Sequence, residues 1–86
     1  MKALQLYREL LPDQIRVLGR DHPETLSNRY QIAFWTEKCG KPSEALGLYQ
    51  KLLHDRGRVL GTNHPDTVDT RHHIQRLSTL DVPPRG

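Results

Sequence analysis

The sequence has few of the residues from which disulfide-bonded, secreted or membrane-spanning proteins are built. Its 86 residues include one cysteine, Cys39, so no disulfide forms within the chain, as is typical of proteins in a reducing compartment. No apolar run approaches the roughly 18 residues that a membrane-spanning helix needs. The first residues contain no apolar signal core. We therefore expect a cytoplasmic protein with no membrane partner.

Apolar and aromatic residues are also scarce. Only 35% of the residues are hydrophobic and 6% aromatic, whereas 27% are charged. This composition predicts one small domain, residues 1–86, with a thin core. The formal net charge is +3 with both signs interspersed, so we do not expect nucleic acid as a partner.

The sequence contains none of the common catalytic or metal-binding motifs. It has no nucleophile elbow, phosphate loop or paired His–Cys signature, so we expect no enzyme. The five histidines lack metal-ligand spacing, and the adjacent His72 and His73 point about 100° apart on a helix. We expect no metal and no cofactor. His22 and His64 occupy equivalent places in a repeat, which indicates an architectural role.

That repeat has a period of 42 residues and fills most of the chain. Of the 33 residue pairs from 3/45 to 35/77, 16 are identical. The matching stretches include residues 16–19 with 58–61 and residues 22–23 with 64–65. A repeat of this length predicts a fold made by stacking one supersecondary unit.

Each unit has the pattern of two helices. Apolar periodicity, prolines near helix starts and glycines at helix ends predict an all-α fold with helices at about 3–18, 23–38, 43–60 and 65–80, and a tail at 81–86. The expected architecture is antiparallel helix-turn-helix, a short α-solenoid. Either Asp21 or His22 caps the second helix. Pro12 should bend or locally open the first helix, and Gly47 and Gly57 should each weaken the third by about 1 kcal/mol relative to alanine.

Small and aromatic residues stand at the packing positions of a known repeat. The segment contains Ile32, Ala33, Gly40, Ala45, Tyr49 and Leu52, and the joint reads Leu-Gly-x-[Asp/Asn]-His-Pro-x-Thr in both copies. This pattern resembles the tetratricopeptide repeat, in the 42-residue variant of kinesin light chains and bacterial arrays. The resemblance implies a non-catalytic protein–protein interaction module, with one complete repeat at 25–60 between two half repeats at 3–18 and 65–80. Gln75 departs from the pattern, since the equivalent residue of the complete repeat is Ala33, and it is typical of a solvent-facing terminal helix.

The resemblance also implies a concave groove that binds a protein or peptide. Its predicted lining is Ser27, Tyr30, Gln31, Phe34, Glu37, Lys38, Asp69, His72, His73, Arg76 and Thr79. Tyr30 and Phe34 are four residues apart and predict one ridge, and His72 and Arg76 predict a matching one. Together these ridges would hold an apolar side chain and an acidic group. The alternative is that Tyr30 and Phe34 are core residues that pack on helix 3–18.

Several charged residues recur in both copies. Arg29 and Arg71 are equivalent, as are Asp13 and Asp55, and this recurrence favours ion pairs between helices over phosphate binding by the arginines. The other arginines considered fall on predicted outer faces, where we expect them to be solvated: Arg8, Arg16, Arg56 and Arg58.

The two half repeats give a second hypothesis for function. Residues 65–80 of one chain and residues 3–18 of another are complementary halves of one repeat. A structural self-assembly module, either a homodimer or a head-to-tail oligomer, is therefore the alternative to a peptide-binding module.

Overall fold

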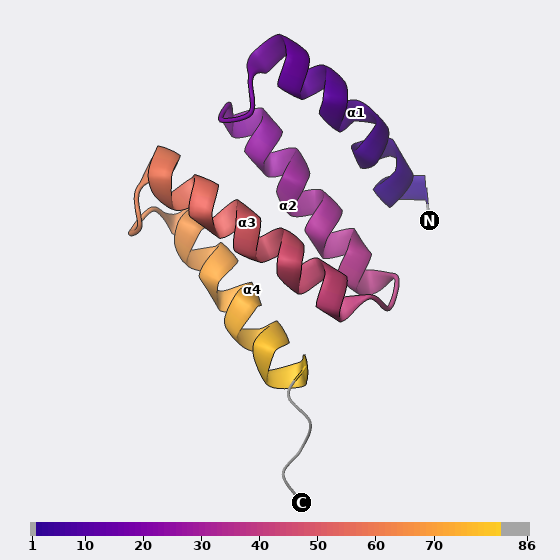
Figure 1. Cartoon of the computed structure of the whole chain (residues 1–86), viewed down its shortest axis with the longest axis vertical. Helices are drawn as coiled ribbons and strands as arrows, with labels where there is room; N and C mark the ends of the chain where they lie inside the picture. Colours follow the sequence, from indigo (N-terminus) through magenta and orange to yellow (C-terminus); the bar gives the residue numbers. More distant parts are fainter. Residues whose placement is uncertain (1, 82–86) are drawn as a thin grey trace, which may run out of the picture.

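A computed structural model describes residues 2–81, and these residues form four helices in a zigzag (Figure 1). The helices are α1 (Lys2–Leu18), α2 (Pro23–Lys38), α3 (Pro42–Leu60) and α4 (Pro65–Asp81). The predicted all-α fold is confirmed, with each helix end within one residue of its predicted place. Asp81, predicted to begin the tail, still belongs to α4, and the rest of the predicted tail lies outside the described residues.

The joint between the two helices of each copy, α1 to α2 and α3 to α4, is built twice from the same residues. Gly19 and Gly61 adopt φ angles of +92° and +99°, which favour glycine and end the preceding helix. His22 then caps α2, because its Nδ1 accepts a hydrogen bond from the backbone N–H of Glu24 at 3.1 Å. His64 makes the equivalent bond at the start of α4, also at 3.1 Å. The histidine, and not the aspartate before it, is therefore the cap.

Pro12 does not interrupt α1. The helix is continuous from Lys2 to Leu18, so the local opening predicted from this proline is not observed. None of the helices in the part of the chain described, residues 2–81, is long and apolar enough to cross a membrane.

Each helix packs mainly on the next one along the chain. The main interfaces join α1 to α2, α2 to α3, and α3 to α4, which gives a flat shape of 50 × 32 × 15 Å. The centre of the core contains Ala33, Ala45, Tyr49 and Leu77, all fully buried. The small alanines let α2 and α3 approach closely, and Tyr49 fills the space where three helices meet.

One of the predicted ion pairs between helices is present. Arg29 Nη1 of α2 donates to Asp55 Oδ2 of α3 at 2.6 Å, with both side chains about three-quarters buried. Arg71, the repeat equivalent of Arg29, instead donates to the backbone carbonyl of Thr62 at 3.0 Å. Asp13, the equivalent of Asp55, contacts the exposed Arg16 of its own helix at 3.3 Å.

Arg56 corrects one prediction, because it is buried and not solvated. It is only 5% exposed, and its Nη1 donates to Thr70 Oγ1 of α4 at 2.7 Å. Its guanidinium also lies over the Tyr30 ring, 5.1 Å from the centroid. A helical wheel predicts one buried stripe of residues along α3. In the structure α3 lies between α2 and α4, so it has a second buried stripe, and Arg56 belongs to it. Arg8, Arg16 and Arg58 are exposed, as predicted.

Two leucines at equivalent places test how strongly this double packing stabilises the fold. Leu52 of α3 is fully buried, whereas Leu10 of α1 is 47% exposed. We expect Leu52→Ala to lower the free energy of unfolding by about 2–5 kcal/mol, because it leaves a cavity, and Leu10→Ala to lower it by about 1 kcal/mol or less. Urea unfolding followed by circular dichroism measures both, and equal losses would contradict the difference in packing.

Candidate functional site

The predicted groove residues of α2 and α4 make two side-chain links between these helices. Tyr30 Oη lies 2.8 Å from His73 Nε2. Arg76 forms a bidentate pair with Glu37, with Nη–Oε distances of 2.6 and 2.8 Å. The Arg76 guanidinium holds the pKa of Glu37 below its usual range, which shows a favourable pair. We call the surface over these links the α2–α4 face.

His73 is the centre of this arrangement. Its ring stacks on Tyr49 with 4.8 Å between centroids and 2° between planes. Arg76 Nη2 lies 2.9 Å from His73 Nδ1, and since a guanidinium only donates, Nδ1 is the acceptor. The proton of the neutral ring is therefore on Nε2, which donates to the Tyr30 oxygen. Burial lowers the pKa of His73, although the nearby Asp69 carboxylate opposes this shift.

Tyr30 and Phe34, predicted to form one ridge, have different ring neighbours. Tyr30 makes edge contacts with the Tyr49 ring at 5.8 Å and the His73 ring at 5.5 Å, so its ring packs on α3 and α4. Phe34 lies edge-on to Trp35 of its own helix, with Lys38 5.2 Å from its centroid. The acidic group predicted for Arg76 is supplied within the chain by Glu37.

The remaining predicted residues are more accessible. Ser27, Lys38, Asp69, His72 and Thr79 are exposed, and Gln31 is half-buried. A pocket of about 210 Å³ on the α2–α4 face is lined by Ser27, Tyr30, Gln31, Arg56, Asp66 and Asp69. Two carboxylates thus stand at a small hollow whose floor contains a tyrosine and a buried guanidinium. This arrangement can hold polar groups of a partner, hydrogen-bond donors above all.

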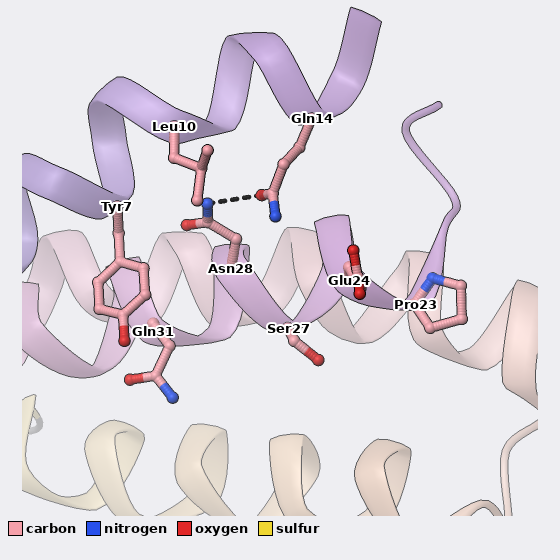
Figure 2. Close-up of a pocket in the computed structure, with 8 residues that line it drawn as sticks. All are labelled: Tyr7, Leu10, Gln14, Pro23, Glu24, Ser27, Asn28 and Gln31. Carbon is pink, nitrogen blue, oxygen red and sulfur yellow. Dashed lines mark hydrogen bonds between the residues drawn. The ribbon is translucent and has the colours of Figure 1, made fainter. Parts of the chain in front are cut away.

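A larger pocket, of about 530 Å³, lies between α1 and α2 (Figure 2). We call it the α1–α2 pocket, and its lining is Tyr7, Leu10, Gln14, Pro23, Glu24, Ser27, Asn28 and Gln31. Asn28 Nδ2 donates to Gln14 Oε1 at 2.6 Å across its wall. The sequence interpretation missed this pocket, although the repeat offsets Tyr7, Leu10 and Gln14 by 42 from the buried Tyr49, Leu52 and Arg56. That register indicates the pocket once it is known that Tyr49 is buried by helices on two sides.

The comparison with known families identifies the family to which the repeat belongs. The sequence model of the tetratricopeptide repeat matches residues 2–24 and 25–66, most of the chain. The chain belongs to the tetratricopeptide repeat family. The second match covers one whole 42-residue unit, which contains α2 from its third residue onward, all of α3 and most of the joint after it. No curated protein and no solved structure matches the chain.

Membership of the tetratricopeptide repeat family supports a general role. Such repeats generally mediate protein–protein interactions and are not catalytic. Within residues 2–81, no group of three or more His, Cys, Asp or Glu residues is placed to hold a metal ion.

The environment of His73 predicts a pH-dependent stability. Its pKa is lowered in the folded state, so the stability that the neutral ring provides is complete above about pH 6.5 and is lost as the pH falls below that value. Protonation would also place a proton on Nδ1, against Arg76. We expect urea unfolding to show a larger loss of stability from about pH 7.5 to about pH 5.5 in the wild type than in His73→Gln.

The adjacent exposed histidine provides the control for this experiment. His72→Gln removes an imidazole of the same helix but none of the contacts with Tyr30, Tyr49 or Arg76, so it should keep the pH dependence of the wild type. If His73→Gln also kept it, the buried ring would not be the titrating group.

Proposed function

We propose that this chain is a non-catalytic, cytoplasmic protein-interaction module, which binds a segment of a partner protein across the α2–α4 face. The observation that carries the proposal is the linkage of α2 to α4 beneath that face. His73 and Arg76 bond to Tyr30 and Glu37, so the two helices are held together before any partner arrives. A preorganised surface loses little conformational entropy on binding.

The chemistry of the face favours a particular kind of partner segment. Ser27, Gln31 and Asp69 offer a hydroxyl, an amide and a carboxylate around one hollow, and Asp66 adds a second carboxylate. Arg76 and Glu37 neutralise each other, and the guanidinium of Arg56 is buried, so the accessible charge at this hollow is negative. We therefore propose a peptide with a basic or amide side chain, with Lys38, Phe34 and His72 as flanking contacts.

Site-specific photo-crosslinking tests the α2–α4 face directly. We expect a photoreactive amino acid at Gln31 to crosslink a partner from cell extract, and the same amino acid at Gln50 to give no such product. Gln50 is an exposed glutamine of α3, and it lines a different pocket, together with Arg20 and Lys51. Mass spectrometry of the crosslinked band identifies the partner.

A blocking variant completes the test. Ser27→Arg puts a long cation at the exposed centre of the face and should remove the Gln31 crosslink, whereas Gln50→Arg should leave it unchanged. Circular dichroism confirms that both variants keep their helices. Crosslinking at Gln50 alone, or insensitivity to Ser27→Arg, would contradict the proposed face.

Self-association is the second candidate function, because one observation favours it. The Arg29–Asp55 pair joins α2 to α3, but the equivalent residues Arg71 and Asp13 lie on α4 and α1 and do not pair with each other in the described chain. A contact between α4 of one copy and α1 of another would unite them.

A further inference from the structure

We propose that α4 of one copy of this chain docks in the α1–α2 pocket of a second copy. There it would lie against α1 and α2 as, within one chain, α2 lies against α3 and α4. This inference rests on the self-association candidate and specifies its contact surface. It concerns a different contact from partner binding at the α2–α4 face, although Ser27 and Gln31 border both surfaces and His72 of α4 takes part in both contacts.

The repeat shows which side chain fills the equivalent pocket inside the chain. Tyr30 of α2 lies against Tyr49, Arg56 and His73, at 5.8 Å and 5.1 Å from the first two and within hydrogen-bond distance of the third. The residues 42 positions earlier are Tyr7, Gln14 and Gln31, and all three line the α1–α2 pocket. The α1–α2 pocket of the first repeat unit is thus equivalent to the site that Tyr30 fills in the second unit.

The wall of the pocket is also built alike in the two copies. The Asn28–Gln14 bond of 2.6 Å has its equivalent in the Arg56–Thr70 bond of 2.7 Å, since both join the same two positions. The packing interface between α1 and α2 therefore repeats the interface between α3 and α4. A helix that packs on α1 as α2 packs on α3 is consequently compatible with the geometry already present.

Exposure shows what such a helix would cover. Leu10 is 47% exposed although its equivalent Leu52 is fully buried, and Tyr7 is half-buried although Tyr49 is fully buried. Leu6 of the same helix is 64% exposed. Covering these three side chains removes apolar surface from water, which favours association.

The residues of α4 fit this pocket in their chemistry. His72 is the repeat equivalent of Tyr30, and it would enter between Gln14 and Gln31 (Figure 2). Each glutamine amide both donates and accepts hydrogen bonds, as a neutral imidazole requires. In this contact His72 therefore takes the place of Tyr30, and the amides of Gln14 and Gln31 take the places of Arg56 and His73.

Charge complementarity fixes the register. With α4 placed as α2 is, Arg71 of one copy meets Asp13 of the other, as Arg29 meets Asp55 within the chain. Gln75 takes the place of Ala33, which lies in the core with Ala45 and Tyr49, so this end of the contact is less closely packed than its internal counterpart. We expect a reversible association for that reason.

Because the two surfaces differ, the contact is heterologous. Each copy offers α4 at one side and the α1–α2 pocket at the other, so copies add head to tail and the average mass grows with concentration. Sedimentation velocity from about 10 µM to about 1 mM covers the range expected of a small, reversible interface.

Two charge reversals and their mixture test the register. Arg71→Asp alone and Asp13→Arg alone should each weaken self-association about 5- to 20-fold, since each places like charges opposite one another. In a 1:1 mixture of the two variants, every contact between unlike chains again joins opposite charges, because either the two substituted side chains meet or the two native ones do. Each contact between unlike chains should therefore regain the affinity of the wild type, so the mixture should associate as the wild type does at about half its concentration.

The control is Lys51→Glu, a charge reversal of an exposed residue of α3, which should leave association unchanged. Circular dichroism verifies the fold of each variant. A wild type that stays monomeric up to about 1 mM would overturn both self-association and this inference. If the single charge reversals did not weaken association, or if mixing the two variants did not restore it, the proposed register would be wrong. Self-association itself would still hold.

Discussion

The contact on which the structure depends is the stack of His73 on Tyr49. Tyr49 belongs to α3 and is fully buried, and the His73 ring of α4 lies parallel to it at 4.8 Å, with the Tyr30 ring of α2 edge-on to both. Three helices thus meet through three aromatic rings. In a chain with so little aromatic content, this single cluster positions α4 relative to α2 and thereby creates the face between them.

The low hydrophobic content is accommodated by the shape of the fold. Because the molecule is only 15 Å thick, no interior position is far from solvent, and helices are buried along seams. Threonines contribute much of what lies inside: Thr25, Thr36, Thr67 and Thr70 are all fully buried. Thr70 satisfies its hydroxyl by donating to the Asp66 carbonyl one turn earlier, at 2.7 Å.

The helices were predictable from the sequence because their signals are local. The glycine and histidine of each joint act within a few residues, and the 42-residue period shows them twice. The environment of Arg56 was not predictable in this way, because it depends on α4, which no periodicity within α3 reveals. The same holds for Arg76, whose carboxylate partner Glu37 is 39 residues away. The α1–α2 pocket was implicit in the repeat, but recognising it required knowing that Tyr49 is buried from two sides.

The one-sided packing of α1 has a consequence for dynamics. This helix contains no fully buried residue, whereas α2 and α3 each contain several. Contacts in the fold are mostly between neighbouring helices, so α1 can open without disturbing the aromatic cluster of α2, α3 and α4. Its backbone amides should accordingly exchange with solvent through local opening at a lower free energy than those around Tyr49. We therefore expect α2, α3 and α4 to form the most stable part of the molecule, and α1 to be the helix that opens most readily.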